Sequence, residues 1–172
     1  AGDTVAVQGI GGLGHLAIQY AHKMGFRTVA ISTSDDKRKL AEELGAHHFI
    51  NAKIQDTAEE LQKLGGADLI LATAPHAKAI SSVVKGLGRN GQILVVAATG
   101  EMVEVSPLDL LMGRKSIAGW PSGTATDSEE TLDFSALFST LPMIETYPLD
   151  KAQEAYDRMM NNDARFRVVL EM

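Results

Sequence analysis

Short apolar runs alternate with segments of helical periodicity along most of the chain. Strands are predicted at residues 4–8, 28–32, 48–51, 68–73, 92–98 and 116–120. These runs lack the regular apolar–polar alternation of a strand with one solvated face, so both faces of their sheet should be covered. Strands of this kind, each followed by a helix, predict a parallel, doubly wound α/β sheet.

The segments between the strands carry helix signals. Helices are predicted at residues 13–24, 36–44, 57–65, 77–87 and 107–112. Gly25 and Gly45 stand where a left-handed residue commonly ends a helix. The third helix opens with capping-box spacing between Thr57 and Glu60, and Pro107 is typical of a first helical turn.

Residues 1–120 are therefore predicted to form a six-stranded Rossmann-type sheet, with strand order 3-2-1-4-5-6 and right-handed crossovers. The tail, residues 121–172, follows a different pattern. It predicts a loop at 122–128, a helix at 129–138, an amphipathic helix that starts at Pro148 and runs through Met160, and a strand at 166–171. We therefore divide the chain into the sheet domain 1–120 and the C-terminal tail 121–172.

Composition narrows the class of protein. The 172 residues are 45% hydrophobic and 22% charged, which is typical of one globular domain. A net charge of −6 without a basic block argues against a nucleic-acid partner. No apolar run approaches the ~18 residues of a membrane span, and residues 1–20 carry no signal pattern, so we expect a cytoplasmic protein without a membrane partner. Because Ala1 stands directly before a strand, we expect a piece of a longer protein.

A glycine-rich turn lies between the first predicted strand and the first helix. It consists of Gly9, Ile10, Gly11, Gly12, Leu13 and Gly14, a G-x-G-x-x-G in the strand–turn–helix context. Gly9 permits the tight turn, Gly11 lets a pyrophosphate approach the backbone, and Gly14 lets the helix pack close to the strand. Free N–H groups at the helix start would face the phosphates. We predict dinucleotide binding; a turn without a ligand is the alternative.

The end of the second strand bears on which dinucleotide is bound. An acidic residue there would bind the adenosine ribose and repel a 2′-phosphate, but the strand ends in Ser32. The residues that follow include neutral donors and cations, which suit a phosphate: Thr33, Ser34, Lys37 and Arg38. Asp35 and Asp36 could instead reach the ribose. NADP is therefore favoured, and NAD stays the alternative.

The histidines and the absence of cysteine argue against a metal or thiol centre. Without Cys, the chain has no disulfide, thiolate zinc site or cysteine nucleophile. The adjacent His47 and His48 would point to opposite faces of a strand and cannot chelate one ion. His15 stands beside the glycine turn, either as a water-mediated phosphate contact or as a surface histidine. We expect no metal ligand and no catalytic residue in this chain.

Four segments read together suggest a family. Residues 2–17, 30–34, 147–149 and 166–170 read GDTVAVQGIGGLGHLA, AISTS, YPL and FRVVL. These segments resemble the zinc-dependent medium-chain alcohol dehydrogenases, and in particular their NADP-dependent, cinnamyl-alcohol-dehydrogenase-like branch. The resemblance implies hydride transfer between a primary alcohol or aldehyde and nicotinamide. It also implies that Ser32, Thr33, Ser34 and Lys37 hold the 2′-phosphate.

Three residue pairs are expected near the nicotinamide, because ligands of open α/β sheets bind at the carboxyl ends of the strands. They are Thr73 with Ala74, Ala97 with Ala98, and Gly119 with Trp120. By the resemblance, backbone groups of the last two pairs hold the carboxamide. The alternative is that their small residues serve packing alone.

The resemblance also indicates what the chain lacks. In the family, cysteine and histidine ligands from another domain hold the catalytic zinc, and a cysteine cluster there holds a second zinc. We therefore expect zinc only in the complete protein, where the tail would pack on that domain, and we expect this chain alone to be inactive. Two alternatives stay open: half of a zinc-free quinone or enoyl reductase, and a free-standing dinucleotide-sensing module.

The sixth predicted strand, residues 116–120, lies at an edge of the sheet and carries no charge. An uncharged edge offers unpaired N–H and C=O groups to another strand. Two-fold pairing of two such edges would close at a dimer, and the related family assembles in this way. We expect a homodimer through this strand; the alternative is that residues 123–141 fold over the edge.

Overall fold

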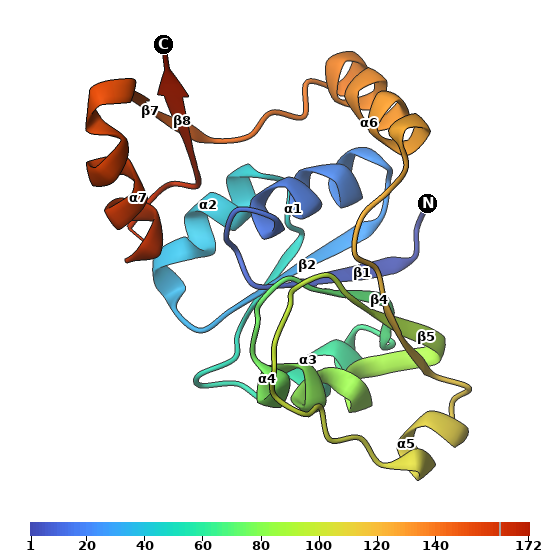
Figure 1. Cartoon of the computed structure of the whole chain (residues 1–172). Helices are drawn as coiled ribbons and strands as arrows, with labels where there is room; N and C mark the ends of the chain where they lie inside the picture. Colours follow the sequence, from blue (N-terminus) through green and yellow to red (C-terminus); the bar gives the residue numbers. More distant parts are fainter. Residues whose placement is uncertain (162) are drawn as a thin grey trace.

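The computed structural model describes residues 1–161 and 163–172 and contains a six-stranded parallel sheet of order β3-β2-β1-β4-β5-β6 (Figure 1). The strands are β1 (Thr4–Gln8), β2 (Arg27–Ser32), β3 (His48–Asn51), β4 (Ala67–Ala72), β5 (Leu87–Val95) and β6 (Ser116–Gly119). The register places Ala6 at the sheet centre between Val29 and Ile70. The predicted Rossmann-type fold is confirmed.

Helices cover the two faces of the sheet in the order that right-handed crossovers impose. One face carries α1 (Gly14–Lys23), the 3-10 turn η1 (Asp35–Lys37) and α2 (Arg38–Glu43). The other face carries α3 (Thr57–Lys63), α4 (Ala77–Val83), the 3-10 turn η2 (Val84–Gly86) and α5 (Pro107–Leu111) (Figure 1). Among the described residues, no helix has the length and apolar character needed to cross a bilayer.

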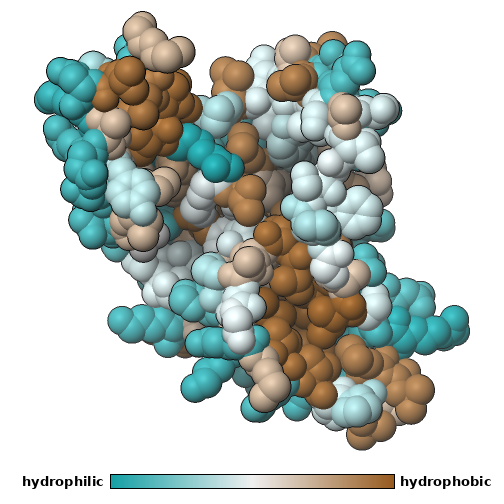
Figure 2. Space-filling model, in the orientation of Figure 1, coloured by the Kyte–Doolittle hydropathy of each residue, from teal (hydrophilic) through white to brown (hydrophobic). Residues whose placement is uncertain are grey.

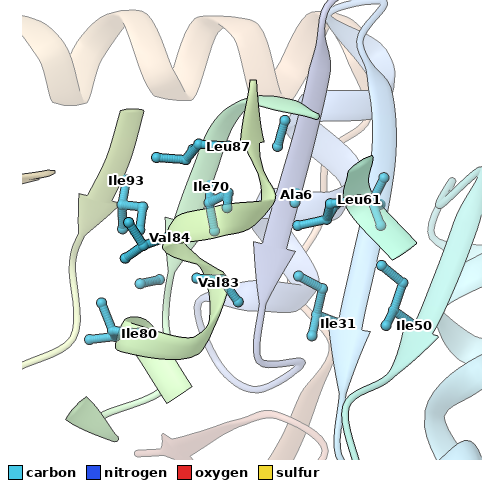
Figure 3. Close-up of a cluster of buried hydrophobic side chains, with 13 residues drawn as sticks. Ala6, Ile31, Ile50, Leu61, Ile70, Ile80, Val83, Val84, Leu87 and Ile93 are labelled. Carbon is cyan, nitrogen blue, oxygen red and sulfur yellow. The ribbon is translucent and has the colours of Figure 1, made fainter. Parts of the chain in front are cut away.

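The larger hydrophobic cluster lies between the sheet and helices α3 and α4. Leu61, Ile70 and Ile80 have no exposed surface there, and Figure 3 shows them gathered in one layer. A second cluster, on the α1 face, joins Ile18 with Phe166 from the far end of the chain. The second cluster therefore fixes part of the tail against the sheet domain.

The tail forms its own elements beside α1 and α2 (Figure 1). They are α6 (Ala125–Phe138), β7 (Ile144–Pro148), the 3-10 turn η3 (Leu149–Lys151), α7 (Ala152–Met160) and β8 (Arg167–Glu171). β7 and β8 pair in parallel as a two-stranded sheet. Within the described part of these helices, α6 buries no residue and α7 buries Ala155 alone. The tail is therefore mostly exposed.

Several element boundaries differ from the predicted ones. α6 starts at Ala125, inside the predicted loop 122–128, because Thr124 and Asp127 form a capping box. Pro148 ends β7, a strand that was not predicted, and is the N-cap of η3, so the α-helical part of the predicted helix starts later, at Ala152. Asp56, and not Thr57, caps α3, since its carboxylate accepts the Glu59 N–H at 3.0 Å. β5 begins earlier than predicted and ends at Val95, so residues 96–98 lie beyond it.

Candidate dinucleotide site

The glycine turn between β1 and α1 leaves bare backbone beside an open space. Gly9 has a φ of 97°, a conformation that L side chains rarely adopt. A Cβ on Gly14 would lie 1.9 Å from the Gly9 carbonyl oxygen, so only glycine allows α1 to start this close. A Cβ on Gly11 would meet no described atom within 4 Å. The two outer glycines therefore shape the turn, whereas Gly11 faces a free volume.

The start of α1 is not capped by a side chain. Leu13 is its N-cap residue and makes no capping hydrogen bond, and Ile10 precedes it as a buried anchor of the turn. The His15 N–H donates to the Gly11 carbonyl oxygen at 3.1 Å, and the positive end of the helix dipole faces the space beside the turn. An anion placed there would be stabilised by this end of the dipole.

Thr73, after β4, supports the turn from the side. Its hydroxyl donates to the carbonyl oxygens of Gln8 at 2.9 Å and Gly9 at 3.1 Å. Ala74 follows, and its Cβ would lie 3.1 Å from a Cβ placed on Gly9. Thr73 and Ala74 therefore lie against the glycine turn, with the Thr73 hydroxyl already engaged by backbone carbonyls.

The residues after β2 form a compact polar turn. Ser32 ends the strand, Thr33 is exposed, and Ser34 caps η1 by accepting the Asp36 N–H at 3.2 Å. The Ser34 hydroxyl donates to the Asp36 carboxylate at 2.6 Å. Thr33 and Ser34 thus lie beside the carboxylates of Asp35 and Asp36. The hydrogen bonds that these carboxylates already make limit which further groups the carboxylates can bind.

Asp35 is held by neighbours within this turn. Its Oδ1 accepts from the Arg38 guanidinium at 2.6 Å and its Oδ2 accepts from Asn51 Nδ2 at 2.8 Å. These hydrogen bonds, from Asn51 first and Arg38 second, lower the pKa of the Asp35 carboxyl. Arg38 in turn lies over the Phe49 ring, 4.5 Å from its centre. Arg38 is therefore paired with Asp35 and lies over Phe49 in this structure.

Lys37 points from η1 toward the glycine turn. Its ammonium donates to the Ile10 carbonyl oxygen at 2.8 Å and lies 5.7 Å from the centre of the Phe166 ring. Desolvation by burial, followed by the charge of Arg165, lowers the pKa of Lys37. No carboxylate within 4 Å of this ammonium is found among the described residues. Its charge is therefore uncompensated in the structure.

The tail adds two cations at the same place, and sequence reasoning assigned neither a role. The Arg167 guanidinium lies 3.5 Å from where a Cβ on Gly12 would stand. A cavity of about 330 Å³ lies between the turn and the tail. Its described lining residues include Gly11, Gly12, Lys37, Arg165, Phe166 and Arg167, and none of the described ones is acidic. The signal in the sequence is the pair of arginines that flanks Phe166. Nothing in the local sequence connects this pair to the glycine turn, which lies about 150 residues earlier.

His15 is not a surface histidine, because backbone groups engage both of its ring nitrogens. It has no exposed surface, so the surface interpretation is wrong. Its Nδ1 lies 2.9 Å from the Gly11 carbonyl oxygen and its Nε2 lies 3.0 Å from the Met143 amide nitrogen. The Phe166 ring stacks on it at 4.6 Å between ring centres. Desolvation by burial is the main cause that lowers the pKa of His15.

The remaining predicted residues lie at the carboxyl ends of β5 and β6. Ala97 and Ala98 follow β5, and Gly119 ends β6. Trp120 is 58% exposed and lines an apolar groove of about 520 Å³ that runs beside α1 and over β4. The structure therefore places these residues at the same sheet edge as the glycine turn, but shows no direct contact that brings them together.

Further hydrophobic side chains are exposed on the outside of the molecule. Figure 2 shows them in a band that runs from the middle of one face toward α5, where Leu108, Leu111 and Met112 are exposed. Trp120 and Leu13 are exposed as well. An exposed apolar surface of this extent is typical of a region that another part of a protein covers.

The described side chains do not fit a zinc ion. Across residues 1–161 and 163–172, no three His, Asp or Glu side chains come together as metal ligands. The chain has no Cys. A dinucleotide fits better, because its phosphates would meet the open side of Gly11 and the three cations Lys37, Arg165 and Arg167.

Comparison with known proteins agrees with this fit. The family model described as "Zinc-binding dehydrogenase" matches residues 12–137. An alcohol dehydrogenase of Penicillium expansum is 48% identical over 172 residues, which cover 99% of this chain and 50% of that protein. An alcohol dehydrogenase of an Aspergillus strain is 44% identical, covering 100% of this chain and 50% of that protein.

Solved structures give the same result. A cinnamyl alcohol dehydrogenase from Sorghum bicolor superposes with a TM-score of 0.88 at 30% identity. The match covers 98% of this chain and 48% of that one. The chain therefore spans about half the length of the relatives it matches.

Proposed function

Because this chain belongs to the zinc-binding dehydrogenase family and forms its dinucleotide-binding half, we propose that it binds NADP(H) for hydride transfer between a primary alcohol or aldehyde and nicotinamide. The observation that carries the proposal is the glycine turn, where Gly11 faces open space between Lys37 and Arg167. The bound dinucleotide supplies the hydride donor or acceptor. The residues of this chain bind and orient it.

Each part of the site has a proposed task. The N–H groups at the start of α1 and the Arg167 guanidinium hold the pyrophosphate. Lys37, Ser32, Thr33 and Ser34 hold the 2′-phosphate. The ends of the last three strands, namely Thr73, Ala74, Ala97, Ala98, Gly119 and Trp120, border the nicotinamide. NADP is favoured over NAD because Asp35 is already bound by Asn51 and Arg38, whereas the Lys37 charge has no acidic partner among the described residues.

Calorimetric titration of the chain with NADPH and NADH tests this proposal. We expect NADPH to bind several-fold more tightly, with a difference that shrinks at high salt because charged contacts are screened. Lys37→Ala should weaken NADPH about tenfold and leave NADH nearly unchanged. Lys39→Ala, whose side chain is 88% exposed on α2, is the matched control and should change neither. Equal affinities of the unmodified chain for both nucleotides would contradict the NADP preference.

The glycine turn allows a second, independent test. Gly11→Ala should leave folding intact, since its Cβ meets open space, but should abolish dinucleotide binding by colliding with the pyrophosphate. Gly14→Ala should lower both binding and the free energy of unfolding, because its Cβ would overlap the Gly9 carbonyl. If Gly11→Ala bound NADPH with unchanged affinity, the pyrophosphate could not bind at this turn, and the proposal would be contradicted.

The tail and the apolar groove support a second element of the proposal. We infer that, in the complete protein, the half of the relatives that this chain does not span packs on the groove beside α1 and on the exposed face of residues 121–172. That half would also supply the zinc ligands, so this chain alone should not oxidise alcohols. Turnover of a primary alcohol with NADP by the purified chain would contradict this. A cytoplasmic location stays a prediction.

The free edge of β6 supports a homodimer. The Trp120 N–H donates to the Val95 carbonyl at 3.0 Å, so by the alternation of a strand the Ala118 N–H also faces β5. Ile117 and Gly119 then present their N–H groups outward, to a second copy. Gly119→Pro should abolish the dimer in analytical ultracentrifugation and keep the sheet, whereas Ala118→Pro should damage the sheet itself. A pure monomer of the unmodified chain at micromolar concentration would contradict the dimer.

A further inference from the structure

Three polar side chains on one face of α1 hold the start of the tail. His15, Gln19 and Lys23 recur every four residues, which places them on the same side of the helix. Gln19 Nε2 donates to the Leu141 carbonyl at 3.0 Å, and Lys23 Nζ donates to the Ser139 carbonyl at 2.8 Å. His15 Nε2 receives the Met143 N–H. α1 therefore binds the segment that leads from α6 to β7.

His15 is the only one of the three that also contacts the glycine turn. A carbonyl oxygen can only accept and a backbone N–H can only donate, so the contacts with Gly11 and Met143 require a neutral ring with its proton on Nδ1. The ring is fully buried and stacks on Phe166. Both ring nitrogens are thus committed in one defined tautomer.

Met143 passes this link on to the tail cations. Its carbonyl oxygen accepts the N–H groups of Phe166 and Arg167, each at 3.0 Å. A continuous hydrogen-bonded path therefore runs from the Gly11 carbonyl through His15 and Met143 to Arg167. The path joins the turn expected to bind the pyrophosphate to the guanidinium that lies over it.

We propose that neutral His15 is a positioning residue of the dinucleotide site: it ties Met143 to the glycine turn and thereby keeps Arg165 and Arg167 beside Gly12. The proposal rests on the proposed function, because the positioned cations matter for a bound phosphate. It assigns the tail a part in cofactor binding that depends on the protonation state of one buried ring.

Protonation of His15 would break this arrangement. The protonated Nε2 would place an N–H opposite the Met143 N–H, and two donors repel. Arg167 of β8 is the charged group that acts on the His15 ring. Lys37 of η1 and Arg165 lie over the Phe166 ring that stacks on it, and no described residue that lines the adjoining cavity is acidic. Gln19, on α1 itself, is neutral. Burial and Arg167 lower the pKa of His15 below 6.5, so the tail is docked at neutral pH and should detach as the pH falls below this range.

Two variants separate the hydrogen bonds from the ring. His15→Gln retains one donor and one acceptor but does not titrate, whereas His15→Phe retains the stack on Phe166 and loses both hydrogen bonds. Docking is measured without ligand, as hydrogen-exchange protection of the Met143, Phe166 and Arg167 amides relative to intrinsic rates. Binding is measured with NAD⁺, because its pyrophosphate diester, unlike the 2′-phosphate monoester of NADP, does not titrate near neutral pH. His48→Gln, at an exposed histidine of β3, is the matched control.

At neutral pH, we expect His15→Phe to lose protection of the three amides and to bind NAD⁺ about tenfold more weakly. We expect the unmodified chain and His48→Gln to lose both properties together as the pH falls below 6.5. His15→Gln should retain both across this range, and nitrogen NMR of the unmodified chain should show His15 protonated on Nδ1.

The failures are distinguishable. Unchanged protection in His15→Phe with binding intact, or one shared pH profile for His15→Gln and the unmodified chain, overturns the positioning role alone. Absence of dinucleotide binding by the unmodified chain overturns the proposed function and with it the positioning role. If His15→Phe does not fold, His15→Gln decides. A pH profile of His15→Gln that differs from that of the unmodified chain supports the proposal, and an identical profile refutes it.

Discussion

The sheet domain and the tail are stabilised in opposite ways. Every residue of β1 is buried, and the adjoining helices α1, α3 and α4 each place several residues in the core. In the tail, β8 is almost wholly exposed and α6 buries none of its described residues. The domain is therefore held by apolar burial, whereas the tail is held by Phe166, by hydrogen bonds from α1, and by the contacts of Tyr20 with Phe134 and Ser135.

The difference shows how a few specific contacts can fix the position of the tail on the domain without a hydrophobic core in the tail. The tail contacts that carry specificity converge on the glycine turn, through His15, Lys37 and Phe166. Within the tail, the ion pair of Arg158 with Glu145 joins α7 to β7, and the same carboxylate accepts the Arg165 N–H at 2.9 Å. The end of the tail is thus arranged as a cover for one loop of the domain.

The largest effect should come from matched truncations in the two regions. Leu61→Ala, at a site with no exposure in α3, should lower the free energy of unfolding by about 2–5 kcal/mol through lost burial and a residual cavity. Leu132→Ala, 70% exposed in α6, should change it by no more than about 0.5 kcal/mol. Urea denaturation measures both. Comparable losses in the two variants would show that α6 is buried in solution.

Phe166, a buried aromatic residue of the tail, should give the next largest effect. Phe166 is 9% exposed and packs with Ile10 and Ile18, so Phe166→Ala should cost about 3 kcal/mol of docking free energy. Hydrogen exchange should show lost protection in β7 and β8 and unchanged protection in β4. Phe138→Ala, at a 44% exposed site of α6, is the matched control and should leave both regions unchanged. Equal loss of protection in β4 and β8 would mean that domain and tail unfold as one unit.

The hydrophobic pattern of the sequence predicts the sheet domain well, because the apolar positions of the sequence are the positions that are buried in this domain. The positions of strands β1 to β4 follow from uninterrupted apolar runs, and their order follows from the crossovers of a doubly wound sheet. β5 is predicted too short at its start, because the polar residues Arg89 and Asn90 interrupt the pattern, and Asn90 has a φ of 60°. An irregular strand of this kind has no periodic signature.

The tail is predicted in part: its helices and last strand are found as α6, α7 and β8, whereas β7 and the contacts of the tail with the domain are missed. β7 alternates exposed and half-buried residues and ends in Pro148, which in isolation indicates the start of a helix. The cover of the glycine turn by Arg165 and Arg167 depends on the docking of Phe166, a contact across about 150 residues of sequence. Local spacing predicts the glycine turn itself, but it carries no information on which distant side chains approach it.

Arg167 of the tail and Lys37 of the domain should differ in which nucleotide, NADPH or NADH, they help to bind. Arg167, from the tail, lies over Gly12, where a pyrophosphate common to NADPH and NADH would bind. Arg167→Ala should therefore weaken both nucleotides by a similar factor, about tenfold, whereas Lys37→Ala should weaken NADPH alone. Calorimetry of the two variants with both nucleotides measures this. A selective loss of NADPH in Arg167→Ala would instead assign the tail cation to the 2′-phosphate.

The smallest effect should separate two histidines by region. His47, in the domain, accepts the Thr28 N–H at 3.0 Å through Nδ1, and its ring lies 5.2 Å from that of His22. Desolvation, followed by the charges of His22, His48 and Arg27, lowers the pKa of His47 below 6.5. The unfolded chain then binds more protons than the folded one below this value, so this contribution to stability is complete above pH 6.5 and declines as the pH falls. Because the His47 ring is largely exposed, the decline should be modest.

His47→Gln should flatten the acid dependence of global unfolding in urea. It should leave in place the acid-dependent exchange of the tail amides, which depends on His15. If His47→Gln removed the acid dependence of the tail as well, the two regions would share one titrating group, and the separation between a buried domain and a docked tail would fail.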